Sequence, residues 1–151
     1  MIDIGKSMGN ATPPKVLRAS YLRTTYRVCA NGIDFDIMVG RASVGLDRWL
    51  RENGWTFWAF ISACNPGSRL LSGRMNRNRH EALISHLADR GRIWFPAVGV
   101  PNGSSWPSEP SVFVPTISVT DARWIGKSFG QNALLYGKRS TIPRLLWCSY
   151  H

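Results

Sequence analysis

The chain has 151 residues, 44% of them hydrophobic, and a formal net charge of +10 at pH 7. This composition is typical of one packed domain and excludes a disordered chain. No apolar run approaches the roughly 18 residues that a membrane-spanning helix needs, so we expect no membrane segment. The excess of positive charge favours partners rich in phosphate or carboxylate groups, although a charge that only keeps the protein soluble explains it equally well.

The N-terminal residues are polar and contain Pro13-Pro14 but no apolar core of a signal peptide. We therefore predict a flexible tail over residues 1–16, a single domain over residues 17–151 and a cytoplasmic location. The three cysteines, Cys29, Cys64 and Cys148, lie far apart, which predicts free thiols without a disulfide or a zinc site. Cys64 could act as a nucleophile, but a buried cysteine at a strand end is more often a small hydrophobic residue.

The first element expected after the tail is a β-hairpin. Asn31-Gly32 is the typical two-residue loop of a type I′ turn, and it predicts strands over residues 22–28 and 33–39. With this loop, apolar residues pair on one face of the hairpin, while Arg27 lies opposite Asp36 on the other face. Alternation alone explains the outward position of Asp34 and Asp36, so a catalytic pair of carboxylates is not needed there.

A short helix and a central strand follow. Ser43 can cap a helix that runs to about Glu52 and stops at Asn53-Gly54. The strand over residues 55–64 carries a single hydroxyl between Phe57 and Ala63, which predicts burial on both of its faces. It stops at Asn65-Pro66-Gly67, because proline cannot donate to a β-ladder, and the end of such a strand is a usual place for binding groups.

The densest basic segment lies between Arg69 and Arg92, where a loop over residues 65–75 leads into a helix over about residues 76–90. Within it, Arg69, Arg74 and Arg77 are candidates for binding an anion such as phosphate, with help from the helix N-terminus. A solvated helix face is the alternative explanation for most of these arginines.

The remaining elements complete the predicted fold. We expect a strand over residues 93–100, in which Pro96 suggests an edge or a bulge, and a second strand over residues 111–117. Thr120 is a candidate cap for a helix that ends near Phe129, and two late strands cover residues 132–136 and 145–148. Together the elements predict an α+β domain with a mixed, mostly antiparallel sheet, an N-terminal β-hairpin and about three flanking helices.

Several separated motifs in order resemble a bacterial family, the domain-of-unknown-function family DUF3293. The resemblance extends over roughly residues 21–146 and depends on five motifs: Tyr21-Leu22-Arg23-Thr24-Thr25-Tyr26, Phe60-Ile61-Ser62-Ala63-Cys64-Asn65-Pro66, Ser72 with Asn76 and Arg79, Trp106 with Glu109-Pro110-Ser111, and Phe129-Gly130-Gln131-Asn132-Ala133. Cys64 stands where an aromatic residue is more usual, and the helix is unusually rich in arginine. The resemblance implies kinship and carries no established activity.

The polar residues of these motifs fall at the ends of predicted elements. If those ends converge, they form a pocket with one carboxylate, one guanidinium and several amides that can orient a small polar ligand. The binding candidates are Asn65, Ser72, Asn76, Arg79, Ser111, Gln131 and Asn132, and Glu109 is the catalytic candidate. Alternatively, these side chains satisfy backbone groups at the ends of helices and strands.

Three functions remain open at this point. The first is binding of nucleic acid or an acidic protein partner through the arginines, with Trp94 and Trp106 as exposed stacking residues. The second is an enzyme that acts on a small polar or phosphorylated substrate, with Glu109 as general acid or base and Arg79 holding an anion. The third is an accessory subunit of a larger assembly. No metal or cofactor motif is present, so we expect no cofactor, and the sequence does not determine the oligomeric state.

Overall fold

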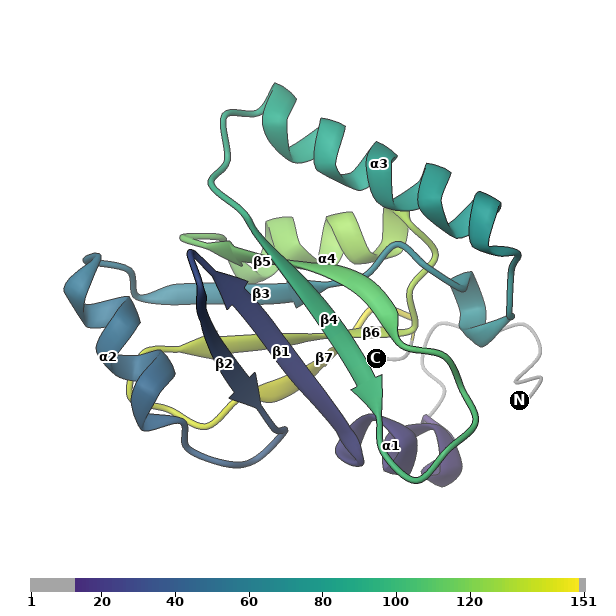
Figure 1. Cartoon of the computed structure of the whole chain (residues 1–151), viewed down its shortest axis with the longest axis horizontal. Helices are drawn as coiled ribbons and strands as arrows, with labels where there is room; N and C mark the ends of the chain where they lie inside the picture. Colours follow the sequence, from purple (N-terminus) through teal and green to yellow (C-terminus); the bar gives the residue numbers. More distant parts are fainter. Residues whose placement is uncertain (1–12, 150–151) are drawn as a thin grey trace.

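A computed structural model describes residues 13–149 of the chain (Figure 1). These residues form an α+β domain in which their seven strands make one sheet in the order β2-β1-β4-β5-β3-β6-β7. The strands are β1 (Thr24–Ala30), β2 (Ile33–Ile37), β3 (Phe57–Ile61), β4 (Phe95–Pro101), β5 (Glu109–Pro115), β6 (Ala133–Lys138) and β7 (Arg144–Trp147). The helices are α1 (Lys15–Leu22), α2 (Val44–Glu52), α3 (Gly73–Asp89) and α4 (Val119–Ser128), with a short 3₁₀ turn, η1 (Pro66–Ser68). None of the helices within the described residues has the length and apolar composition needed to cross a bilayer.

The sheet combines three sequential hairpins with one inserted strand. The hairpins are β1–β2, β4–β5 and β6–β7, and β3 lies between β5 and β6. All six neighbouring pairs in the described part of the chain are antiparallel, so the expectation of a mixed sheet is corrected.

The sheet is curled, so that β1 and β4 cross in front of β3 and β6 in Figure 1. The central strands bury side chains on both faces because each face packs against its own helices. On one face, α3 and α4 cover a core that includes Ala59, Ile61, Leu83, Leu87, Val112, Val114, Ile125 and Leu134. On the other, α2 covers a core that includes Tyr26, Val28, Leu46, Leu50, Trp58, Phe60, Phe113 and Leu135.

The sequence-based expectations for the first half of the sheet are largely confirmed. The hairpin has the expected register, with Ala30 opposite Ile33 and Arg27 opposite Asp36, and these two charged side chains lie 2.8 Å apart. Ser43 caps α2 by accepting a hydrogen bond from the Leu46 backbone. In β3, Trp58 to Ile61 are buried, whereas Phe57 remains 43% exposed.

The helices differ from the expectation in number and in their starts. The hairpin is preceded by α1, so within residues 13–149 four α-helices flank the sheet rather than three. Most of the predicted tail, residues 1–12, lies outside the described residues, and Lys15 and Val16 form the first turn of α1. The cap of α4 is Ser118 rather than Thr120, because the extended backbone of Ser118 lets its hydroxyl accept a hydrogen bond from the Asp121 backbone at 3.0 Å.

Pro96 does not mark an edge strand, since β4 lies between β1 and β5. The ladder with β1 runs from Pro101 to Ala97, so Pro96 lies just beyond its end. The proline is therefore accommodated in an interior strand at a position where β1 requires no donor.

Candidate ligand pocket

The chain leaves β3 through a tight turn that is centred on Asn65. This residue adopts the left-handed conformation, with φ 47° and ψ 59°, which asparagine tolerates better than most residues. Its side-chain oxygen accepts hydrogen bonds from the Leu71 backbone at 2.9 Å and from Asn76 Nδ2 at 2.8 Å. In return, Asn76 Oδ1 accepts from the Asn65 backbone at 2.9 Å. The two asparagines thus hold the turn against the first turns of α3.

Glu109, the first residue of β5, faces this turn. Its Oε1 accepts a hydrogen bond from Asn65 Nδ2 at 2.7 Å. Burial raises the pKa of Glu109, and hydrogen bonds from Asn65 and Trp106 offset part of this rise. The carboxyl group is therefore held in place while its charged form is partly desolvated, which is a common condition of binding and acid–base groups.

The loop between α4 and β6 reaches the same turn. Gln131 donates from Nε2 to the Cys64 carbonyl at 3.0 Å, and Asn132 donates from Nδ2 to Ser68 Oγ at 2.8 Å. Gly130 has φ +70°, and a Cβ there would lie 2.8 Å from Cβ of Pro66. This close approach requires glycine and brings Gln131 and Asn132 to the end of β3.

These groups border a cavity of about 290 Å³ at one end of the sheet. The predicted residues that line it are Asn65, Glu109, Ser111, Gln131 and Asn132. Its floor includes Phe60 and Leu135, and Ser62 and Ser68 add hydroxyl groups. A pocket with an apolar floor and a few convergent polar groups is the usual form of a small-molecule site.

The outer walls come from segments that the sequence did not mark as site residues. Leu17, Ser20 and Tyr21 of α1 form one wall, and the loop between β4 and β5, with Trp106, forms another. Asn102 joins the two walls, since its Nδ2 donates to the Arg23 carbonyl at 2.9 Å and to Thr25 Oγ1 at 2.8 Å. Trp106 is half-buried against the cavity, so the expectation of an exposed stacking residue is wrong for it, as it is for the half-buried Trp94.

Arg79 does not line this cavity. Its Nε donates to the Ala63 carbonyl at 2.6 Å and its Nη2 to the Phe129 carbonyl, so the guanidinium ties the end of β3 to the end of α4. Asn76 likewise lies behind the turn. Both residues support the pocket rather than face it.

The other predicted residues lie outside the cavity. Ser72 caps α3 by accepting a hydrogen bond from the Met75 backbone at 3.2 Å. Arg69, Arg74 and Arg77 are exposed on the loop and first turns of α3. They therefore form a basic surface next to the pocket-forming turn and contribute nothing to the lining.

Cys64 has the environment of a packing residue. It is 1% exposed, and its Sγ contacts the Pro110 carbonyl at 3.6 Å. Burial raises the pKa of the Cys64 thiol, which disfavours the thiolate that a nucleophile needs. The cysteines are all free thiols, as expected. Among residues 13–149, no group of three or more His, Cys, Asp or Glu side chains is placed to hold a metal ion.

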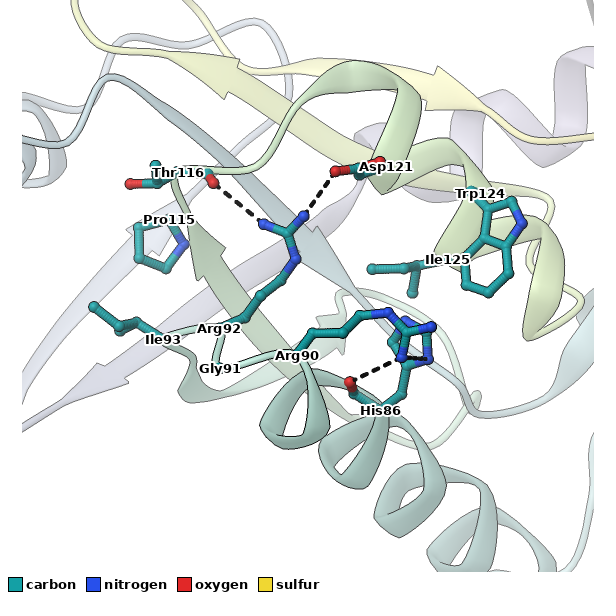
Figure 2. A pocket seen from close by; sticks show the side chains of 10 residues that line it. All are labelled: His86, Arg90, Gly91, Arg92, Ile93, Pro115, Thr116, Asp121, Trp124 and Ile125. Atoms are coloured by element: carbon teal, nitrogen blue, oxygen red, sulfur yellow. Dashed lines mark hydrogen bonds and ion pairs between the residues drawn. The ribbon is translucent and has the colours of Figure 1, made fainter.

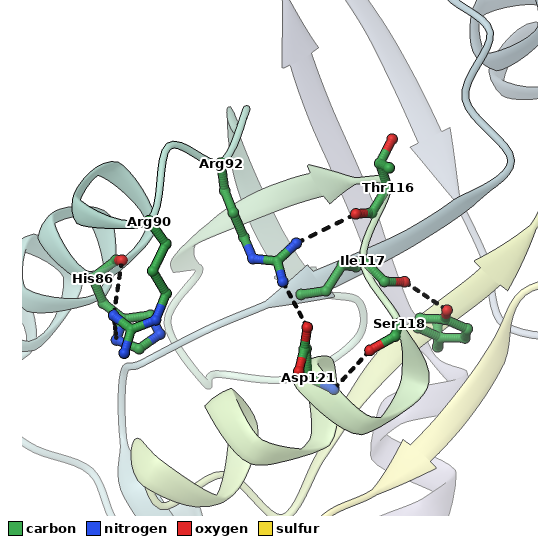
Figure 3. Close-up of polar contacts among 8 residues, drawn as sticks. His86, Arg90, Arg92, Thr116, Ile117, Ser118 and Asp121 are labelled. Carbon is green, nitrogen blue, oxygen red and sulfur yellow. Dashed lines mark hydrogen bonds and ion pairs between the residues drawn. The ribbon is translucent and has the colours of Figure 1, made fainter.

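A second, more open cavity of about 610 Å³ lies between the end of α3 and the start of α4 (Figure 2). In it, Arg92 donates to the Thr116 carbonyl at 3.3 Å and to Asp121 Oδ2 at 2.7 Å, while Arg90 contacts His86 Nδ1 at 3.0 Å (Figure 3). None of the predicted site residues lines this α3–α4 groove.

Residues 61–134 match the model of the family described as "Protein of unknown function (DUF3293)". This match confirms the resemblance to DUF3293 for residues 61–134. The match runs from the last residue of β3 into β6, so the DUF3293 region supplies Asn65, Glu109, Gln131 and Asn132. The motif Tyr21 to Tyr26 lies outside the matched residues, although α1 and β1 wall the same cavity. Searches of curated proteins and of solved structures found no match.

Proposed function

We propose that this protein binds a small polar ligand in the pocket at the end of β3. The observation that carries the proposal is the convergence of Glu109, Asn65 and Gln131, from three separate parts of the chain, on one cavity of about 290 Å³. A merely structural network would not need an open volume lined by these groups together with hydroxyls and an aromatic ring.

Among the lining groups, the carboxyl group of Glu109 favours a ligand that carries an N–H donor. Glu109 is the carboxylate of the lining, and it already accepts from Asn65, which fixes its orientation. A carboxylate has about four lone-pair sites, so it can accept a further hydrogen bond from an amine or amide. If the ligand is also a substrate, Glu109 is the group best placed for general acid–base catalysis, because burial raises the pKa of its carboxyl group.

Matched probes can test this chemistry by two-dimensional ¹H–¹⁵N NMR. Benzylamine and benzamide offer N–H donors on the same ring, whereas benzoate offers a carboxylate that Glu109 repels. We expect the first two to shift the side-chain signals of Asn65 and Trp106, which are the groups that hydrogen-bond to Glu109. Benzoate should leave these signals unchanged.

The Glu109→Gln variant should weaken binding of the amine, because the uncharged amide removes the charge-assisted hydrogen bond. Glu52→Gln, with the same change at an exposed residue of α2, is the matched control and should bind as the unaltered protein does. Equal shifts with benzoate, or equal binding by Glu109→Gln, would contradict the proposal.

Association with nucleic acid through Arg69, Arg74 and Arg77 is the second candidate. It is favoured by their exposure and by the ion pairs of residues 13–149, Arg27–Asp36 and Arg92–Asp121, which leave these three arginines unneutralised. Binding to a DNA duplex should then weaken as salt rises, and replacing the three arginines by glutamine should reduce the slope of this dependence.

A further inference from the structure

The α3–α4 groove contains charged and aromatic groups that the ligand pocket does not use. It is bounded by the end of α3 and residues 90–93 on one side, and by residues 115–116 and α4 on the other (Figure 2). Its volume, about 610 Å³, is within the range of sites for small molecules and cofactors.

Two guanidinium groups are held at this groove by different contacts. Arg92 is anchored to Asp121 and to the Thr116 carbonyl, and Asp121 is itself positioned at the N-terminus of α4, where its backbone donates to Ser118 Oγ (Figure 3). Arg90 donates to His86, and within residues 13–149 no carboxylate lies at ion-pair distance from it. Since a guanidinium carries five N–H donors, both arginines retain donors for an anion.

An exposed tryptophan stands beside these cations. Trp124 is 54% exposed, whereas the other six tryptophans are buried or half-buried. The His86 ring stacks on its indole with a centroid distance of 5.3 Å, and the Arg90 guanidinium carbon lies 5.8 Å from the ring centroid. The indole is thus fixed in orientation by His86 and Arg90, while the exposure of the residue leaves part of the ring open to a planar ligand.

His86 contributes orientation rather than charge. Its Nδ1 contacts Arg90, and its Nε2 is buried without a partner among the described residues. Burial, followed by the nearby Arg90 and Arg92, lowers the pKa of His86, which disfavours the charged imidazolium. The cationic groups that face the groove are therefore Arg90 and Arg92, against the single carboxylate of Asp121.

We infer that the α3–α4 groove binds a nucleotide unit, with its phosphate at Arg90 and Arg92 and its heteroaromatic base against Trp124. Guanidinium groups match the geometry of phosphate, and aromatic side chains stack on bases irrespective of sequence. The unit can come from a free nucleotide or from a single-stranded nucleic acid, because both present the same ring and phosphate. This site is separate from the ligand pocket and from the Arg69, Arg74 and Arg77 surface.

Calorimetric titration with AMP, adenosine and inorganic phosphate tests the inference on the full chain. AMP carries both groups, so it should bind more tightly than adenosine or phosphate alone. Arg90→Gln and Trp124→Ala should each weaken AMP binding by at least about fivefold, since each removes one of the two contacts. Arg48→Gln makes the same charge change at an exposed residue of α2, on the other face of the sheet. This control should change the affinity for AMP by less than about twofold.

A single-stranded dA10 probe then separates the two sources of the nucleotide unit. If dA10 binds more tightly than AMP and loses this binding in Trp124→Ala, the ligand of the groove is a single-stranded nucleic acid. If AMP binds and dA10 binds no more tightly, the ligand is a free nucleotide. The inference is overturned if neither probe binds, if phosphate binds as well as AMP, or if Arg90→Gln and Trp124→Ala both bind normally. Loss of dA10 binding only when Arg69, Arg74 and Arg77 are replaced would also overturn it. Trp124→Phe, which keeps an aromatic face, should restore part of the binding lost in Trp124→Ala.

Discussion

The ligand pocket and the α3–α4 groove hold their polar groups in two different ways. In the pocket, Asn65, Glu109 and Gln131 bond to one another or to the backbone of the loops that carry them. In the groove, Arg90 is exposed and bonds only within its own helix turn. The groups that form the pocket therefore also hold the fold, as Arg92 does in the groove through Asp121 and the Thr116 carbonyl, whereas Arg90 forms no hydrogen bond to another element. Substitutions of the pocket groups and of Arg90 should therefore differ in their effect on stability.

The largest difference in the free energy of unfolding is expected between variants of two arginines. Arg79→Ala removes the donor to the Ala63 and Phe129 carbonyls and should lower the free energy of unfolding by about 3 kcal/mol, because hydrogen bonds from a charged group to partly buried partners are among the strongest. Arg90→Ala, in the groove, should change it by less than about 0.5 kcal/mol. Urea denaturation measures both values. Equal stability of the two variants would remove the distinction between pocket and groove.

A somewhat smaller effect is expected from Asn76, which lies behind the pocket turn. Asn76→Ala leaves the Asn65 backbone N–H without its acceptor and should cost about 2 kcal/mol of unfolding free energy. Asn78→Ala is the matched control, since Asn78 is exposed on the same helix. If Asn76→Ala is as stable as Asn78→Ala, the reciprocal asparagine pair does not hold the turn.

The smallest effect on stability is expected from Glu109, and this effect depends on pH. Its pKa is raised in the folded protein, mainly by burial, so folding favours the protonated form. The corresponding stability is present below the pKa of the unfolded chain and is lost as the pH rises through the raised pKa of the folded state. Glutamine mimics the protonated form, so the melting temperature of Glu109→Gln relative to the unaltered protein should rise with pH over this interval.

The matched variant Glu52→Gln should show no such trend, because Glu52 is exposed. Thermal unfolding followed by circular dichroism at several pH values gives the comparison. A flat difference for Glu109→Gln would indicate that its carboxyl group is not desolvated.

Local signals in the sequence predict the hairpin and the helix cap at Ser43, because Asn31-Gly32 and the alternation of side chains fix a register without any distant contact. The antiparallel order of the sheet is not predictable in this way, since β3 pairs with strands that lie far along the chain. Helix α1 is not predicted from the sequence for a similar reason. Its eight residues bury only Leu17, and such a short helix depends on packing against the rest of the domain.

The composition of the pocket could be predicted in part. Asn65, Glu109 and Gln131 fall at element ends, and they do meet around one turn. The sequence could not separate Asn76 and Arg79 from the lining residues, because the helical period does not say which neighbour each side chain meets. The exposure of Trp124 could have been predicted from the sequence, since Ala122 and Ile125 define the buried side of α4 and Trp124 lies away from it.

The insertion of β3 between β5 and β6 has a consequence for the order in which the nascent chain can assemble. Ala59 pairs with Val114 on one side and with Tyr136 on the other, so the ribosome finishes β3 well before either partner exists. Until then the uncharged segment Phe57–Ile61 is an unpaired aromatic strand of the kind that self-associates. Synthesis that stalls or terminates before β6 therefore leaves an aggregation-prone intermediate. We expect such C-terminally shortened chains to enter inclusion bodies while the complete chain folds.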